Sequence, residues 1–207
     1  PHGLRGLFVK ELPRARELRT VVAAADHLLD IQSTSQDVEP FWVYPAYARN
    51  SAAALAIGLP AVHLVMPGGL GSGTPVIQHG HFGEASGRGV GVVVECGQHF
   101  RQAAADVAID VTRRFLAHFG LVAHDPAAMS PEAPRRFELL QTVVIKTPEF
   151  RFVRPCIGFE VFARGELIAT DGPDEIRAPC DDCTILMPAR ATIVGREGVY
   201  LSRPLDQ

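Results

Sequence analysis

Residues 90–100, which read Val-Gly-Val-Val-Val-Glu-Cys-Gly-Gln-His-Phe, constrain the fold of this chain more than any other stretch. The run of valines has no polar alternation, which is typical of a strand covered on both faces of a sheet. A buried strand does not explain Glu95, a carboxylate at the carboxyl end of the run. In α/β sheets, ligands bind at the carboxyl ends of the strands. Glu95 is therefore a candidate functional residue. A carboxylate also stabilises the start of a following helix, and on this stretch alone both interpretations stay open.

The bulk composition excludes several classes of partner. The chain has 207 residues, a hydrophobic fraction of 47% and a formal net charge of −3. This length can hold one large domain, or a medium and a small one, with a sizeable core. The small net charge gives no electrostatic footprint for nucleic acid or for an anionic membrane. We therefore expect neither as a partner.

The sequence also carries an expectation about location. No apolar run approaches the ~18 residues of a membrane-spanning helix, and the first residues lack a signal-peptide pattern. Four cysteines are too few for a disulfide scaffold at this size, so reduced thiols are expected. These features favour a cytoplasmic protein. Because the chain begins at Pro1 without an initiator Met, we also expect a missing upstream segment.

The first part of the chain, residues 1–124, alternates between strand and helix patterns, which favours a mostly parallel sheet flanked by helices. The predicted helices cover residues 14–26, 52–57 and a stretch ending near His118, and the predicted strands cover 28–31, 61–66 and 90–94. The aromatic residues within 41–47 are consistent with the wall of a loop or with packed core. We expect an α/β domain here.

The second part of the chain changes character. Three prolines among Ala, Asp and Glu residues predict a linker over 125–138. From residue 139 onward no helical period is present, and short strand patterns predict a small all-β domain over 139–207, a barrel or a sandwich. The predicted strands cover 142–145, 150–153, 158–163, 166–169, 184–187 and 198–201.

Three shorter patterns have a functional and a structural interpretation. The Gly-rich residues 67–75 follow a strand, as in phosphate sites, but Pro75 and the lack of Lys-Ser/Thr favour a mobile loop. His79 and His81 resemble a metal-ligand pair without a third ligand, which favours surface histidines. Cys180 and Cys183 have metal-knuckle spacing without a second pair, which disfavours a zinc ribbon.

Three stretches, in order and spacing, carry a resemblance to a known family. They are Ala25-Asp-His-Leu-Leu-Asp-Ile-Gln-Ser-Thr34, Val92-Val-Val-Glu-Cys-Gly97 and Arg196-Glu-Gly-Val-Tyr200. They resemble the succinylglutamate desuccinylase and aspartoacylase family, which are zinc-dependent deacylases with a zinc-carboxypeptidase-like α/β fold and a β-rich C-terminal domain. The resemblance implies that residues 1–124 are the C-terminal portion of the catalytic domain and that 139–207 are the β-rich domain.

The resemblance also implies a zinc cofactor. In the family, a His-x-x-Glu motif and a later His in Asp-Leu-His bind the metal; this chain reads Asp30-Ile31-Gln32 at the later motif. Gln32 therefore stands at the position of a ligand, although an amide binds zinc poorly. The His-x-x-Glu motif, and an Asn-Arg that grips the substrate carboxylate, are expected before Pro1. The chain as written lacks a complete zinc site.

The other site residues follow from the same resemblance. Glu95 matches the general base, which takes a proton from the attacking water and passes it to the leaving amine. Tyr200 matches a tyrosine that reaches the substrate, with an ordinary strand tyrosine as the alternative. Asp30 matches the strand aspartate before the ligand and is expected to have a supporting role.

We therefore expect a metal-dependent hydrolase that removes the acyl group from an N-acyl amino acid or a related small amide. Its substrate is a small molecule. A homo-oligomer is expected only because most soluble oligomers are homo-oligomers. The alternative is a catalytically impaired relative that binds a metabolite or a partner protein, because Gln32 replaces a zinc ligand. A third interpretation is that Gln32 was introduced to trap substrate, or that another metal tolerates the amide.

Overall fold

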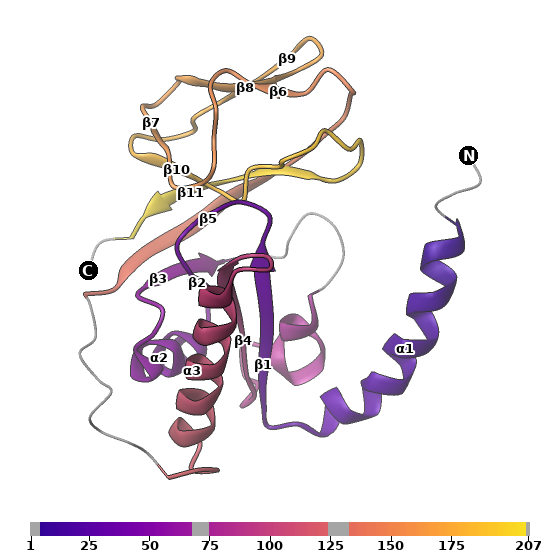
Figure 1. The fold of residues 1–207 in the computed structure, drawn as a ribbon, viewed down its shortest axis with the longest axis vertical. Coiled ribbons are helices and arrows are strands. Elements are labelled where there is room, and N and C mark those ends of the chain that lie inside the picture. Colours follow the sequence, from indigo (N-terminus) through magenta and orange to yellow (C-terminus); the bar gives the residue numbers. More distant parts are fainter. Residues whose placement is uncertain (1–4, 68–74, 124–132, 206–207) are drawn as a thin grey trace.

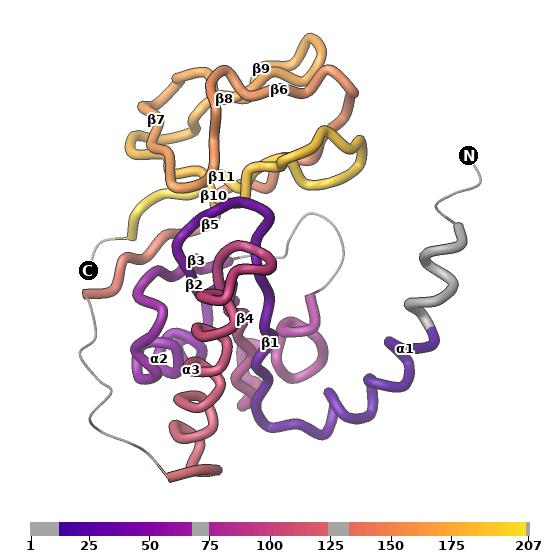
Figure 2. Tube along the Cα trace, viewed as in Figure 1, coloured from indigo at the N-terminus to yellow at the C-terminus, as the bar shows by residue number. Residues whose placement is uncertain are grey.

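The fold is organised around β4 (Val90–Gln98), which lies between β1 (His27–Thr34) and β2 (Phe41–Pro45) in the computed structural model (Figure 1). The structure describes residues 5–67, 75–123 and 133–205, with side chains from Pro13 onward (Figure 2). β4 runs parallel to β1 and antiparallel to β2. Its residues 90–97 are buried, which confirms the covered strand predicted from the valine run.

Five further strands extend this sheet to eight. In order from β2 they are β3 (Val62–Met66), β5 (Arg135–Val144), β11 (Glu197–Pro204), β10 (Cys183–Leu186) and β7 (Val161–Phe162). β2, β3 and β5 are parallel to one another, whereas β11, β10 and β7 each run antiparallel to the strand before them. The predicted α/β class, with a mostly parallel central sheet and antiparallel C-terminal strands, is confirmed.

Two helices cover one face of the sheet around β4. α2 (Ala48–Ile57) and α3 (Gln102–His118) pack on an apolar cluster that includes Trp42, Val92 and Val94. The short helices η1 (Val76–Gln78) and η2 (Gly80–Phe82) belong to the other side, where Ile77 packs beside Val93. Gly91 interrupts the valine run because a Cβ there would lie only 3.0 Å from the carbonyl oxygen of Ile77.

The helix α1 (Arg5–Ala24) differs from its prediction and stands apart from the sheet (Figure 1). The expected packing helix over 14–26 began after Pro13, but the observed helix begins earlier and contains Pro13. Its apolar side chains Leu18 and Val21 are 42% and 65% exposed, so the described residues do not bury them. None of the helices in the described ranges is long and apolar enough to cross a membrane.

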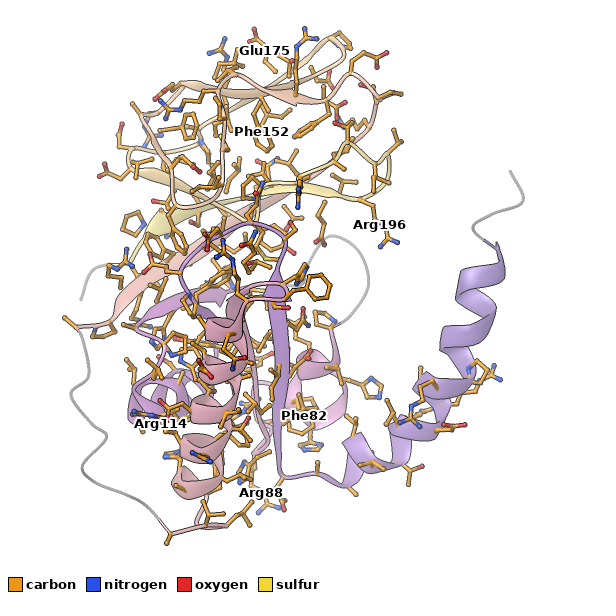
Figure 3. The ribbon with its side chains drawn as sticks, in the orientation of Figure 1. Phe82, Arg88, Arg114, Phe152, Glu175 and Arg196 are labelled. Atoms are coloured by element: carbon orange, nitrogen blue, oxygen red, sulfur yellow. The ribbon has the colours of Figure 1, made fainter. Side chains whose placement is uncertain are left out.

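The C-terminal part adds a second, three-stranded sheet. It consists of β6 (Arg151–Phe152), β8 (Leu167–Asp171) and β9 (Asp174–Arg177), in the order β6–β8–β9. A separate apolar cluster connects it to the large sheet and includes Ile168 from β8, Ile185 from β10 and Leu201 from β11. Phe152, labelled in Figure 3, packs against this cluster. The β-rich character expected after residue 139 agrees with these strands.

One difference concerns the expected linker over 125–138. Residues 124–132 lie outside the described part, and residues 135–138 are the first residues of β5, where they pair with β3. β5 then continues to residue 144 and pairs with β11, so a single strand joins the α/β part to the β-rich part. The division into domains stays a prediction. Of the Gly-rich stretch over residues 67–75, residues 68–74 also lie outside the described part.

Candidate active site

The pairing of β1 with β4 brings two predicted site residues together. Gln32 and Glu95 are direct partners in the parallel register, and Asp30 is the partner of Val93. Side chains alternate between faces along a strand, so Asp30 and Gln32 share the face of the sheet to which Glu95 and Val93 belong. The α2 and α3 helices cover the other face. Asp30, Gln32 and Glu95 therefore lie close together, at the carboxyl ends of two neighbouring strands.

Glu95 is buried without full hydrogen bonding. Its side chain is 3% exposed, and its Oε2 atom has no hydrogen-bond partner among the described residues. Burial, and to a lesser extent the negative charge of Asp30, raises the pKa of Glu95 to about 7. A carboxyl group with this pKa exchanges a proton readily near neutral pH, which is the property that acid–base catalysis requires.

Gln32 is exposed and makes a defined contact within the site. Its Nε2 donates a hydrogen bond to Oδ2 of Asp30 at 3.0 Å. Because a carboxylate can only accept in this contact, the amide nitrogen must face Asp30, and the amide oxygen is the group left for other contacts. Asp30 therefore orients the Gln32 amide, and its supporting role in the site stays a prediction.

Tyr200, near the C-terminus of the chain, lies on the same face of the sheet as Glu95. On β11 it is 5% exposed and packs in the apolar cluster that contains Phe41 and Val93. Burial, a hydrogen bond to Glu197, and the charges of Glu197 and Glu95 all raise the pKa of Tyr200, so its hydroxyl stays a proton donor. This hydroxyl donates to Oε2 of Glu197 at 2.7 Å.

Sequence reasoning missed the contact of Glu197 with the candidate site residue Tyr200. Residues three apart on a regular strand point to opposite faces, so the spacing of Glu197 and Tyr200 gave no reason to pair them. The register of β11 against β5 shifts between Glu197 and Val199. Such an irregularity re-aims a side chain, and here it lets Glu197 reach the tyrosine hydroxyl.

The described residues do not fit a zinc site. No group of three or more His, Cys, Asp or Glu side chains within the described ranges could hold a metal ion. Gln32 offers a neutral carbonyl oxygen, which zinc disfavours. His81 donates through Nε2 to the carbonyl of Ala25 at 2.9 Å, and all four cysteines are free thiols. The zinc cofactor stays a prediction of the resemblance.

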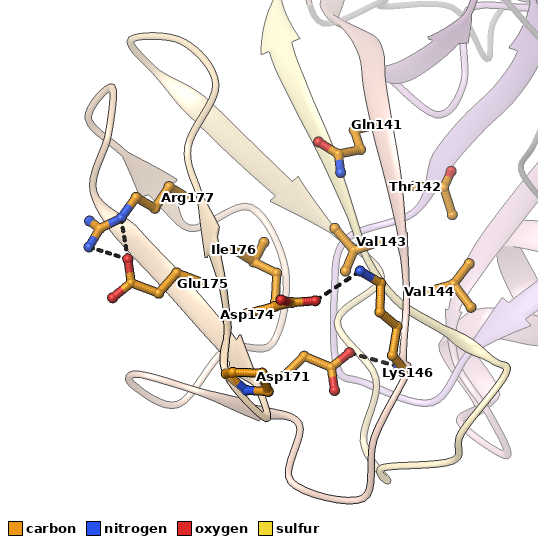
Figure 4. A pocket seen from close by; sticks show the side chains of 11 residues that line it. Gln141, Thr142, Val143, Val144, Lys146, Asp171, Asp174, Glu175, Ile176 and Arg177 are labelled. Carbon is orange, nitrogen blue, oxygen red and sulfur yellow. Dashed lines mark hydrogen bonds and ion pairs between the residues drawn. The ribbon is translucent and has the colours of Figure 1, made fainter.

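One cavity lies beside Gln32, and another lies in the C-terminal part of the chain. A cavity of about 400 Å³ is lined by Gln32, but its other walls are on the α3 side of the sheet, which Cys96 faces. A larger cavity of about 880 Å³ lies between β5 and β9 in the C-terminal part (Figure 4). Its charged walls pair with each other, as in the contact of Lys146 with Asp174 at 2.9 Å, and it is remote in sequence from Glu95.

Comparison with known proteins gives no sequence-level relative. No protein-family model matches the chain, and no curated protein sequence matches it. Solved structures do match. Succinylglutamate desuccinylase from Vibrio cholerae superposes with a TM-score of 0.68 at 18% identity, over 95% of this chain and 61% of that chain. A succinylglutamate desuccinylase/aspartoacylase from Rhodobacter sphaeroides gives a TM-score of 0.63 at 17% identity, over 93% and 63%.

A third similar structure is the product-bound ectoine utilization protein EutE (DoeB) from Ruegeria pomeroyi, with a TM-score of 0.62 at 16% identity, over 91% of this chain and 60% of that chain. The fold and site together define a mixed α/β protein with a buried carboxyl group at the ends of its central strands. More particularly, the fold is that of the succinylglutamate desuccinylase/aspartoacylase structures. This chain spans about 61% of the length of the first of them.

Proposed function

We propose that this chain belongs to a hydrolase that removes the acyl group from an N-acyl amino acid or a related small amide. The observation that carries the proposal is Glu95, a buried carboxyl group with an unpartnered oxygen atom and a pKa of about 7, at the carboxyl end of the central strand. The fold similarity to structures described as desuccinylases and aspartoacylases supports the same reaction class.

In the proposed reaction, ionised Glu95 accepts a proton from a water molecule as the water oxygen attacks the acyl carbon. The same carboxyl group then gives this proton to the amine nitrogen as the carbon–nitrogen bond breaks. One water is consumed, and a carboxylic acid and an amine are released. A pKa near neutrality suits both halves of this cycle, because neither protonation state is strongly favoured.

Tyr200 is proposed to contact the substrate through its hydroxyl group. Its raised pKa keeps the hydroxyl protonated, so it donates to an acceptor such as a substrate carboxylate. In this structure Glu197 accepts that hydrogen bond, so a substrate group would take the place of the Glu197 carboxylate at the tyrosine hydroxyl. A small-molecule substrate, a cytoplasmic location and a homo-oligomer complete the proposal.

A second function is binding without hydrolysis, and Gln32 favours it. The described residues do not form a zinc site, and the Gln32 amide is engaged by Asp30. In this alternative the region around Gln32 and Glu95 binds a metabolite or a partner protein, and Glu95 holds its proton without transferring it.

One pair of assays separates the two functions. Amine release is measured with N-succinylglutamate and N-acetylaspartate, with and without added Zn²⁺, and binding of the same compounds is measured by calorimetry. Amine release above the uncatalysed rate supports the hydrolase. Saturable binding with no amine release under either condition would support the binding protein and reject hydrolysis.

A further inference from the structure

The loop after β4 contains a residue in an unfavourable conformation. Phe100 has a φ of 64°, in the left-handed region that non-glycine residues rarely adopt, and its side chain is 105% exposed. Both features oppose stability, since a left-handed backbone strains an L-residue and an exposed phenyl ring gains nothing from burial. Strained residues of this kind persist where the surrounding structure holds them, and they gather at ligand sites.

Contacts on both sides of Phe100 hold the loop in place. On one side, His99 is joined to β1 twice: its Nδ1 shares a hydrogen bond with Oγ of Ser33 at 2.7 Å, and its backbone N–H donates to the carbonyl of Thr34 at 2.9 Å. On the other side, Nε of Arg101 donates to Oε1 of Gln98 at 2.9 Å. These contacts hold the loop in place. The phenyl ring between them is exposed and meets the neighbouring His99 ring edge-on, with the ring centroids 6.1 Å apart.

The ring forms one wall of the cavity of about 400 Å³ beside α3. This volume is within the range of small-molecule sites. Apolar side chains make up much of the lining, among them Ile31, Cys96 and Ala104. Cys96 follows Glu95 directly in β4, so the cavity and the Glu95 carboxyl group lie on opposite faces of the sheet.

The charge of the residues that line the cavity favours an anionic ligand. Arg101 lines the cavity, and no Asp or Glu does. Arg101 approaches Asp37 at 3.5 Å, but both side chains are more than 60% exposed, and such pairs are weak. The first turn of α3 begins at the same place without an acidic residue, so the partial positive charge of the helix start is not neutralised there.

We propose that Phe100 and Arg101 form a second binding site, for a small carboxylate that carries a flat apolar group. The apolar group stacks on the Phe100 ring above the alanines of α3, and the carboxylate lies toward Arg101 and the start of that helix. The site shares Gln32 with the proposed deacylase site but lies on the face of the sheet opposite Glu95, and the inference does not depend on hydrolysis.

Three probes test the site on the purified protein by calorimetry or ligand-observed NMR. Benzoate has both the ring and the charge, benzyl alcohol has the ring alone, and acetate has the charge alone. We expect benzoate to bind saturably in the millimolar range, and each control to bind about three- to tenfold more weakly. Absence of saturable benzoate binding would overturn the proposal.

Variants locate the binding. Phe100→Ala and Arg101→Gln change exposed side chains, and each is expected to weaken benzoate binding about three- to tenfold. Leu121→Ala, at a 69% exposed position just beyond α3, is the matched control and leaves binding unchanged. Glu95→Gln also leaves it unchanged. Full binding by Phe100→Ala, or loss of binding in Glu95→Gln, would place the probe elsewhere and contradict the assignment, and circular dichroism checks that each variant is folded.

Discussion

Gln32 and Glu95 are paired residues on adjacent parallel strands, so an exposed amide and a buried carboxyl group share one face at the end of the sheet. Asp30 accepts a hydrogen bond from the Gln32 amide, and the negative charge of Asp30 contributes to the raised pKa of Glu95. The proposed chemistry, and the question of the metal, both depend on this arrangement.

The burial of Glu95 predicts a pH-dependent stability. Its pKa is raised from 4.5 to about 7 on folding, so the folded state binds the proton more tightly, and stability falls as pH rises through this interval. Replacing Glu95 by Gln removes this loss. The free energy of unfolding of Glu95→Gln relative to the unmodified protein should therefore increase by roughly 2–3 kcal/mol between pH 5 and pH 8.

Urea denaturation at the two pH values measures this difference. Glu149→Gln, at an exposed position, is the control and should show no comparable change. A difference for Glu95→Gln that is the same at both pH values would mean that the carboxyl group titrates in the folded protein as it does in water.

Removing the Tyr200 hydroxyl is expected to change KM more than kcat. Tyr200→Phe removes the donor to Glu197 and, in the proposed reaction, the donor to the substrate. We expect KM to rise about tenfold with a smaller change in kcat, and stability to fall by about 1 kcal/mol. Glu197→Gln keeps an acceptor for the hydroxyl and should have a milder effect. Unchanged KM in Tyr200→Phe would make this residue an ordinary strand tyrosine.

Gln32→His tests whether the amide is what disfavours zinc. Imidazole is a preferred zinc ligand, and Asp30 is placed to accept a hydrogen bond from its second nitrogen. We expect the zinc content of the purified variant, measured by mass spectrometry, to exceed that of the unmodified protein, with a higher deacylase rate. Gln32→Asn is the control that keeps an amide. Equal zinc content and rate in all three proteins would count against the zinc prediction.

The strained loop gives a prediction about stability. Glycine adopts a positive φ without the steric cost that alanine shares with phenylalanine. Phe100→Gly should therefore unfold with a free energy about 1 kcal/mol higher than that of Phe100→Ala, as measured by thermal or urea denaturation. Equal stability of these two variants would mean that the backbone at residue 100 is not strained in solution.

The parts of the fold that local patterns describe were predictable. The valine run without polar alternation indicated the covered strand β4, and the helical pattern that ends near His118 indicated α3. β9 was missed, because its sequence, Asp-Glu-Ile-Arg, is mostly charged and shows no apolar alternation. The antiparallel pairing of β2 with β4 was also missed, because contacts between distant strands leave no local signal.

The candidate site was predictable only in part. The position of Glu95 at a strand end was visible in the sequence, but its unpartnered oxygen and raised pKa depend on neighbours from β1 and β11. The contact between Glu197 and Tyr200 depends on an irregularity in β11 that no residue pattern marks. Phe100 looked like an ordinary residue after the strand, because strain is a property of the backbone and not of residue type.

The rate of amine release by Glu95→Gln tests the central claim most directly. Glutamine keeps the size of the side chain but cannot accept and return the proton, so the rate with the best N-acyl substrate should fall by at least about 10²-fold. Calorimetry should show that the variant still binds that substrate. A variant that binds the substrate and releases amine at the unmodified rate would contradict the account, because Glu95 would then have no part in the reaction.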